Sequence, residues 1–231
     1  MQAAQLLSDV SAATREIIVR VRPFTMTSPE RVAALCAAAE YVVRNRIPGD
    51  FVECGVWKGG SAMAAALVFL RLGETSRTLH LFDTFEGMSA PTEVDRVAAS
   101  GAAAAEVLAA EDPRGSHVWA VSPLEEVRAN MATVGYPGER IRFIKGKVED
   151  TIPRWAPPTI SILRLDTDWY ESTRHELVHL YPRLSPAGVL IIDDYGHWEG
   201  ARKAVDEYFF GIPDAPLLCR IDYTGRIAVK R

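Results

Sequence analysis

The 231-residue sequence predicts an α/β fold with a doubly wound, mostly parallel sheet and helices on both faces. Two observations lead to this fold class. Short apolar runs alternate with helical segments along most of the chain, which is the pattern of strands joined by crossover helices. No internal repeat, low-complexity tail or linker divides the chain, so we expect a single domain over residues 1–231.

The composition excludes several classes of protein. Hydrophobic residues make up 48% of the chain and charged residues 24%, which is typical of a globular protein and not of a disordered one. The formal net charge of −4 provides no basic surplus for binding a phosphate backbone. Three scattered cysteines, Cys36, Cys54 and Cys219, are too few for a disulfide framework or a zinc site.

Membrane insertion and secretion are not expected either. The longest apolar stretch, residues 61–70, is much shorter than the roughly 20 residues that a membrane span needs. No cationic head followed by an apolar run opens the chain, so we expect a cytoplasmic protein. Neither nucleic acid nor a membrane is therefore an expected partner.

Residues 1–48 predict an N-terminal helical cap. Residues 1–22 favour a helix, which is interrupted by proline. The run Ser28-Pro29-Glu30 then supplies an N-cap, a first-turn proline and an acid next to the helix dipole. A second helix over residues 30–45 follows from the spacing of its apolar residues and should end before Pro48-Gly49.

Strands and helices alternate over the rest of the chain. The expected strands lie at residues 50–54, 78–83, 141–146, 159–166 and 188–193, and the expected helices at residues 61–72, 171–181 and 199–210. Two strand-like runs within residues 217–228, around Thr224-Gly225, predict a C-terminal antiparallel hairpin. Strands separated by helices predict a Rossmann-like sheet.

One segment, residues 86–122, is too long for an ordinary crossover and carries no strand pattern. Residues 97–110 within it favour a helix. A long insertion just beyond the end of a strand usually belongs to the binding face, so we expect a lid or substrate loop. A disordered surface excursion is the alternative.

The turn after the first strand is a candidate cofactor loop. It runs from Glu53 through Gly55 to Ser61, and its glycines let a ligand approach the backbone closely. Glu53 would repel a pyrophosphate and suits a ligand with a cationic end. The alternative is a tight strand-to-helix turn that uses glycine for packing only. Asp83, at the end of the second strand, is placed to bind both hydroxyls of a ribose, or else caps a helix or faces solvent.

Three aspartates predict a metal site. Asp166, Asp193 and Asp194 each close a strongly apolar strand, so their carboxylates should meet at one edge of the sheet. Anions crowded in this way repel one another unless a cation lies among them, and oxygen ligands favour Mg²⁺ over zinc. Helix capping, or one acid with a raised pKa, is the alternative for each single residue.

Two residues are candidate bases. Asp168 follows Asp166 closely enough to take a proton from a hydroxyl whose acidity a metal has increased, or else caps the next helix. His197 is a second candidate base or a substrate donor, although a loop histidine is more often a surface residue. Trp57, Trp169, Tyr195 and Trp198 flank the same edge and are candidates for stacking on a ring or sugar face, or else core residues.

Several segments in this order resemble the macrocin O-methyltransferase (TylF-type) family, over roughly residues 20–210. The matching segments are Pro23-Phe-Thr-Met-Thr-Ser-Pro-Glu-Arg31, Phe51-Val-Glu-Cys-Gly-Val-Trp-Lys-Gly-Gly-Ser61, Leu81-Phe-Asp-Thr-Phe-Glu-Gly-Met88, Leu165-Asp-Thr-Asp-Trp-Tyr-Glu-Ser-Thr173, Ile192-Asp-Asp-Tyr-Gly196 and Ala201-Arg-Lys-Ala-Val-Asp-Glu-Tyr208. The resemblance implies an O-methyltransferase that uses S-adenosylmethionine and Mg²⁺ to methylate a sugar hydroxyl in a glycoside, natural product or polysaccharide. Family members use N-terminal helices in oligomer contacts, which makes a homo-oligomer one expected state.

The resemblance also implies roles for individual residues. The residues implied to contact the cofactor are Thr25, Met26, Glu53, Gly55, Ser61, Asp83, Val148, Glu149, Asp150 and Asp166. Among them, Asp83 would hold the ribose and residues 146–150 would border the adenine. The metal ligands would be Asp166, Asp193 and Asp194, with Asp168 as the base.

Three other functions compete with this interpretation. A catechol-type O-methyltransferase shares the aspartate trio but acts on an aromatic vicinal diol. A nicotinamide dehydrogenase shares the sheet and the ribose acid, but needs a G-x-G-x-x-G turn and no metal trio. A catalytically silent module would bind the cofactor without turnover.

Overall fold

The computed structural model describes residues 8–112 and 118–231. Within them a seven-stranded sheet has the order β3-β2-β1-β4-β5-β7-β6, with β1 to β5 parallel and β7 antiparallel to its neighbours β5 and β6. The strands are β1 (Asp50–Cys54), β2 (Leu79–Asp83), β3 (Ile141–Lys145), β4 (Ile160–Leu165), β5 (Leu184–Ile192), β6 (Cys219–Arg220) and β7 (Arg226–Val229). The order changes direction between β1 and β4, which is where ligands bind in open α/β sheets.

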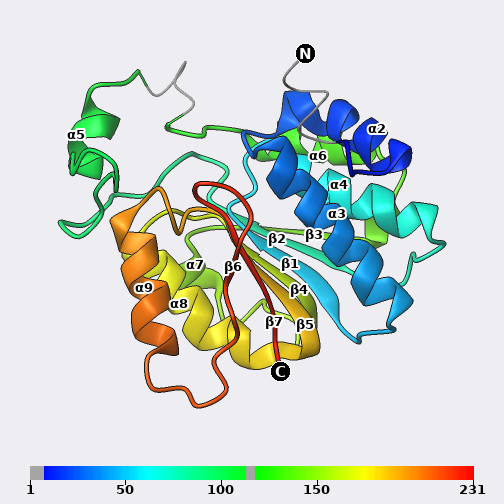
Figure 1. The fold of residues 1–231 in the computed structure, drawn as a ribbon. Helices are drawn as coiled ribbons and strands as arrows, with labels where there is room; N and C mark the ends of the chain where they lie inside the picture. Colours follow the sequence, from blue (N-terminus) through cyan, green and yellow to red (C-terminus); the bar gives the residue numbers. More distant parts are fainter. Residues whose placement is uncertain (1–7, 113–117) are drawn as a thin grey trace.

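Helices cover both faces of the sheet (Figure 1). One face carries α2 (Ala12–Val21), α3 (Pro29–Arg44), α4 (Gly60–Arg71) and α6 (Leu124–Ala132), and the other carries α7 (Val148–Thr151), α8 (Tyr170–Leu180) and α9 (Glu199–Phe209). Short 3₁₀ turns lie at η1 (Arg22–Phe24), η2 (Gly138–Arg140) and η3 (Tyr181–Arg183). The predicted doubly wound fold is confirmed. None of the helices in the described ranges is long and apolar enough to cross a membrane.

Alternation along the strands divides the core between the two faces. On β1, Phe51 belongs to the cluster under α3 and α4, whereas Val52 belongs to the cluster under α8. On β5, Ile191 belongs to the first of these clusters and Ile192 to the second. Strands β1, β2 and β4 are buried on both faces and read as nearly continuous apolar runs, which is why the sequence identified them.

The N-terminal helices lie close to their predicted positions. Helix α3 begins at Pro29, and the Ser28 hydroxyl accepts a hydrogen bond from the backbone N–H of Arg31 at 3.2 Å, as the capping motif predicts. Helix α2 is described from Ala12. Residues 1–7 of the expected first helix lie outside the described residues.

The C-terminal hairpin is confirmed as antiparallel, and it extends the sheet. Arg226 on β7 lies opposite Ile192 at the carboxyl end of β5. The β6–β7 turn therefore returns to the same edge of the sheet as the ends of β4 and β5. The sequence did not predict this return of the chain to the site.

The insertion differs from expectation. Its helix, α5 (Ala104–Ala109), is shorter than the predicted 97–110, because Gly101 adopts φ +72° and the chain turns back so that Arg96 pairs with Ala103. Ala104 and Leu108 pack with Trp169, Trp198 and Ala201 in a third apolar cluster. The insertion is therefore attached to the site loops, except residues 113–117, which lie outside the described residues. Helix α6, which follows it, was not predicted.

A buried carboxylate holds the insertion on α8. Asp95 is fully buried and accepts hydrogen bonds from the backbone N–H of Tyr170 at 2.8 Å and from the N–H and hydroxyl of Thr92 at 2.7 and 2.8 Å. Asp95 thus supplies the N-terminal cap of α8 from another part of the chain, because Trp169 at the N-cap position makes no side-chain hydrogen bond to the helix. A Cβ on Gly200 would lie 1.9 Å from the Asp95 carboxylate, so α9 must present glycine there.

The substitution Asp95→Ala should lower the free energy of unfolding by about 1–3 kcal/mol, because it leaves the helix N–H and the Thr92 groups buried without an acceptor. Urea denaturation with linear extrapolation measures the change. The control is Glu106→Ala, an exposed position on α5, which should stay within about 0.5 kcal/mol of the wild type. Equal stabilities for the two variants would contradict the capping role.

Candidate active site

A cavity of about 380 Å³ opens at the carboxyl ends of the parallel strands. Its walls come from the loops after β1, β2, β3, β4 and β5, from the segment before α3, from the insertion and from the β6–β7 turn. Most predicted site residues line it: Thr25, Met26, Gly55, Ser61, Asp83, Val148, Glu149, Asp166, Asp168, Asp193, Asp194 and His197. Glu53 and Asp150 are not among the residues that line the cavity.

The loop after β1 needs glycine for packing as well as for access. Gly55 has φ +81°, and a Cβ there would lie 2.0 Å from the backbone oxygen of Asp166. At Gly60 a Cβ would lie 2.5 Å from the backbone oxygen of Phe24. Gly55 therefore serves both as part of a tight turn, because it packs against the end of β4, and as part of a candidate cofactor loop, because it lines the cavity.

Asp83 ties this loop to β2. Its carboxylate accepts hydrogen bonds from the backbone N–H groups of Val56 and Trp57 at 2.6 and 3.1 Å, and from that of Phe85 at 2.7 Å. Burial raises the pKa of Asp83, although these N–H groups oppose the shift. The residue predicted to hold a ribose thus also shapes the turn on which a ligand would rest.

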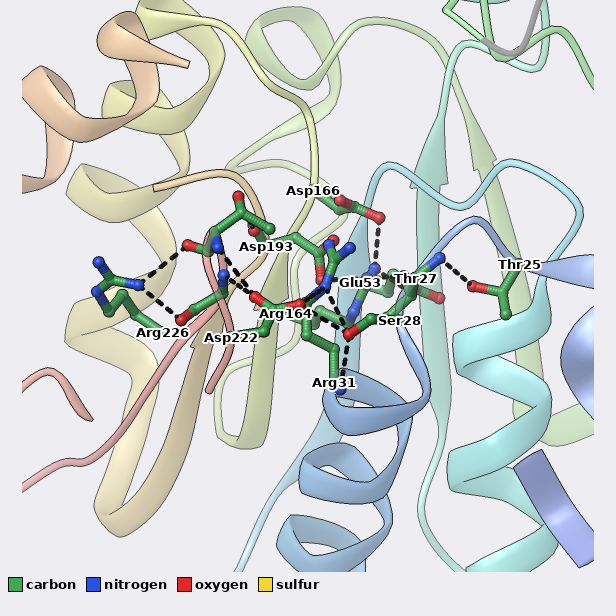
Figure 2. Close-up of polar contacts among 12 residues, drawn as sticks. Thr25, Thr27, Ser28, Arg31, Glu53, Arg164, Asp166, Asp193, Asp222 and Arg226 are labelled. Atoms are coloured by element: carbon green, nitrogen blue, oxygen red, sulfur yellow. Dashed lines mark hydrogen bonds and ion pairs between the residues drawn. The ribbon is translucent and has the colours of Figure 1, made fainter. Parts of the chain in front are cut away.

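Glu53 is not exposed to the cavity, which corrects its expected position. It is buried below the floor, where its Oε1 accepts a hydrogen bond from Arg164 Nη1 at 2.8 Å (Figure 2). Its Oε2 has no partner among the described residues. Burial raises the pKa of Glu53 to about 7, although Arg164 lowers it. Asp150 lies exposed on α7, outside the cavity lining.

Arg164 organises the floor of the site. It is 2% exposed and lies on β4. Its Nη1 also donates to Asp166 at 2.7 Å, and its Nη2 donates to Asp193 at 2.6 Å and to the Thr27 hydroxyl at 2.8 Å (Figure 2). One guanidinium therefore joins β1, β4, β5 and the segment before α3.

A second guanidinium extends this network. Arg31, in the first turn of α3, bonds to Asp193 and donates from Nε to Asp222 at 3.0 Å (Figure 2). Asp222 lies in the β6–β7 turn and also accepts from the Ser28 hydroxyl at 2.7 Å. Both Asp193 carboxylate oxygens therefore contact arginines. Arg31, Arg164, Thr27 and Asp222 were missed as site residues, although an arginine inside an apolar strand was a visible signal.

The carboxylates that gather in the cavity differ by one residue from the predicted metal trio. Oxygens of Asp166, Asp168 and Asp194 lie within 4.8 Å of one another, whereas Asp193 is turned to the arginines. Burial and mutual repulsion raise the pKa of Asp168 to about 7 and those of Asp166 and Asp194 well above their usual range.

This cluster fits a divalent cation that prefers oxygen ligands. Asp194 Oδ2 is buried without a hydrogen-bond partner among the described residues. Only Arg31 and Arg164 form ion pairs with the surrounding acids in the described part of the chain, and neither of them contacts Asp168 or Asp194. A group of close carboxylates in which two members, Asp168 and Asp194, have no ion-pair partner among the described residues is a suitable site for Mg²⁺.

The comparisons with known proteins identify the family. The family model described as macrocin-O-methyltransferase (TylF) matches residues 14–227. The chain belongs to this family. It is therefore an O-methyltransferase, with the fold of S-adenosylmethionine-dependent methyltransferases.

Two curated relatives of this O-methyltransferase come from Streptomyces. The 8-demethyl-8-(2,3-dimethoxy-alpha-L-rhamnosyl)-tetracenomycin-C 4'-O-methyltransferase of Streptomyces olivaceus is 39% identical over 203 residues, which cover 87% of this chain and 73% of the relative. The demethyldecarbamoylnovobiocin O-methyltransferase of Streptomyces niveus is 35% identical over 201 residues, with the same coverage of 87% and 73%.

Solved structures agree with this assignment. The O-methyltransferase NovP superposes with a TM-score of 0.76 at 34% identity, covering 90% of this chain and 82% of that one. The calicheamicin methyltransferase CalS11 shares the fold, with a TM-score of 0.68 at 18% identity and coverage of 99% and 90%.

Aromatic residues lie unevenly around the cavity of this methyltransferase. Trp57, His197, Trp198 and Tyr223 line it, whereas Tyr195 donates its hydroxyl to Asp206 at 2.7 Å outside the lining. Trp169 donates its indole N–H to the backbone oxygen of Ser89 in the insertion at 2.9 Å. Burial, and then Arg31, lower the pKa of His197.

The substitution Arg164→Met should lower the free energy of unfolding by about 3–5 kcal/mol, because it leaves buried carboxylates without their shared cation. Urea denaturation measures the change. The control is Arg128→Met, which removes an exposed ion pair to Glu125 on α6 and a cation–π contact with Phe143, and should cost about 1 kcal/mol or less. A loss at Arg164 no larger than at Arg128 would show that the buried network contributes little.

Proposed function

We propose that this O-methyltransferase transfers a methyl group from S-adenosylmethionine to a hydroxyl of a sugar in a glycoside, natural product or polysaccharide, with the help of Mg²⁺. The observation that carries the proposal is the cluster of Asp166, Asp168 and Asp194 at the junction of the cofactor loops and the insertion. The name of the Streptomyces olivaceus relative, which contains a rhamnosyl group, supports a sugar acceptor.

The cofactor would occupy the side of the cavity under the loops after β1, β2 and β3. When bound, S-adenosylmethionine supplies an electrophilic methyl group on a sulfonium. Asp83 would bind the ribose, Val148 and Glu149 would border the adenine, and Thr25 and Met26 would close over the cofactor. Their common position on the cavity wall supports this assignment.

Asp166 and Asp194 would hold the metal ion, with Asp168 or Asp193 as the third carboxylate. When bound, a divalent cation increases the acidity of an acceptor hydroxyl. Each oxygen of Asp193 already contacts an arginine, so Asp193 would share or exchange an arginine partner if it became a ligand. The chain's own residues then orient the acceptor and take up its proton, for which Asp168 is the first candidate and His197 the second.

The deciding experiment incubates the purified protein with S-adenosylmethionine, MgCl₂ and single acceptors. The acceptors are demethyldecarbamoylnovobiocin, a rhamnosylated tetracenomycin that lacks the sugar methyl group, and catechol as an aromatic diol. Tandem mass spectrometry shows which group gains the methyl. Methylation on the sugar is expected. Methylation of catechol alone would replace the sugar proposal with the aromatic one, and binding of S-adenosylhomocysteine without turnover on any acceptor would favour a silent binding module.

The substitution Asp166→Asn should abolish Mg²⁺-dependent turnover and leave the affinity for S-adenosylhomocysteine within about threefold, a change of less than one kcal/mol. Calorimetric titration and initial rates over a range of Mg²⁺ concentrations measure both effects. The same titration on Asp193→Asn decides whether Asp193 joins the ion, because a lost ligand raises the half-saturating Mg²⁺ concentration. Full turnover in Asp166→Asn would remove the metal assignment.

The two candidate bases can be separated by paired substitutions. Asp168→Asn should lower kcat by about 100-fold or more, the usual contribution of a general base, while His197→Gln should lower it less than tenfold. Rates at saturating Mg²⁺ and saturating cofactor provide the comparison. The reverse order of the two losses would assign the proton transfer to His197.

A further inference from the structure

One exposed aromatic residue at the cavity has no role in the functions described so far. Tyr223 lies in the β6–β7 turn, lines the cavity and leaves 62% of its surface exposed. An exposed tyrosine in a loop is ordinarily mobile and unremarkable. Tyr223 is different because the residues on either side of it are held in place by buried or partly buried polar contacts.

Asp222 fixes the turn on the side of α3. Its Oδ1 accepts hydrogen bonds from the backbone N–H groups of Thr224 and Gly225 at 3.0 and 2.7 Å, which closes the turn on itself. Its Oδ2 accepts from Ser28 and Arg31, so the turn is joined to the first turn of α3 (Figure 2).

Thr224 fixes the turn on the side of β5. Its buried hydroxyl donates to the backbone oxygen of Asp193 at 2.8 Å, and its own backbone oxygen accepts from the N–H of Gly196 at 2.9 Å. A Cβ on Gly196 would lie 2.1 Å from the backbone oxygen of Tyr223, so the two loops are in close contact. The backbone of Tyr223 is therefore held at a set place relative to the carboxylate cluster.

In the sheet order, the turn that carries Tyr223 lies beyond β5, away from the cofactor loops. The cofactor loops follow β1, β2 and β3, whereas Tyr223 is next to β5 in the sheet order, as is His197. The ring centres of Tyr223 and His197 are 6.2 Å apart and their planes meet at 81°. Asp166, at the end of β4, comes between the cofactor loops and the end of β5 in this order.

We propose that Tyr223 is an acceptor-binding residue that stacks its ring on the apolar C–H face of the sugar whose hydroxyl is methylated; this rests on the proposed sugar acceptor. A tyrosine provides a large apolar face and a hydroxyl at its edge, which suits a ring that has C–H groups on its face and hydroxyls at its rim. Because the turn is already ordered and the side chain has few rotatable bonds, little entropy is lost on binding.

The test compares Tyr223→Ala and Tyr223→Phe with the wild type, using whichever glycoside the wild type methylates. Tyr223→Ala should lower kcat/KM by about 10- to 100-fold, mainly through a higher KM for the glycoside, as truncation of a central aromatic contact does. Tyr223→Phe keeps the ring and should stay within about threefold. The affinity for S-adenosylhomocysteine and the thermal midpoint should not change. Phe210→Ala, at a residue that is 90% exposed away from the cavity lining, is the matched control and should match the wild type.

The outcomes are distinguishable. An unchanged glycoside KM in Tyr223→Ala, with an active wild type, would overturn the stacking role and leave the proposed function intact. A fall in S-adenosylhomocysteine affinity equal to the loss in kcat/KM would also overturn it, because the ring would then cover the cofactor. A wild type that methylates only catechol would overturn the proposed function and this inference together.

Discussion

The buried guanidinium of Arg164 is the contact on which the rest of the site depends. Five carboxylates approach one another where β1, β4 and β5 end: Glu53, Asp166, Asp168, Asp193 and Asp194. Without a cation below them their mutual repulsion would separate the strand ends. Arg164 contacts three of the five and leaves Asp168 and Asp194 to face the cavity. The result is a floor that is rigid and still carries excess negative charge.

The same network connects distant parts of the chain to the site. Arg31 joins the start of α3 to Asp193 and Asp222, and Asp222 positions the turn that carries Tyr223. On the opposite side, Asp95 attaches the insertion to the start of α8, just after Asp168. The loops around the carboxylates are therefore held by buried polar contacts as well as by apolar packing. Such preorganisation is what a methyl transfer requires, since positioning of the reactants supplies much of the catalysis.

The family assignment and this geometry support each other in different ways. The match over residues 14–227 shows an O-methyltransferase, whereas the geometry supports the residues that we propose to bind the cofactor, the metal and the acceptor. Residues of the insertion and of the β6–β7 turn also line the cavity, so in the proposed function they are candidates for contacting the acceptor. The choice of acceptor should therefore depend on these two segments more than on the sheet.

The sequence by itself determined the doubly wound sheet, the capped start of α3 and the aspartates at the strand ends, because these depend on local patterns: apolar runs, capping residues and the position of an acid after a strand. Only the tertiary structure decided which way each side chain turns. Glu53 and Asp193 belong to the same kind of motif as Asp194, yet their carboxylates face arginines from β4 and α3, whereas no arginine pairs with Asp194 among the described residues. Arg31 and Tyr223 are 192 positions apart in the sequence (223 − 31). Arg31 reaches the site from the start of α3, whereas Tyr223 reaches it because β7 pairs with β5. Contacts of this range leave no local periodicity, so the sequence pattern could not predict them.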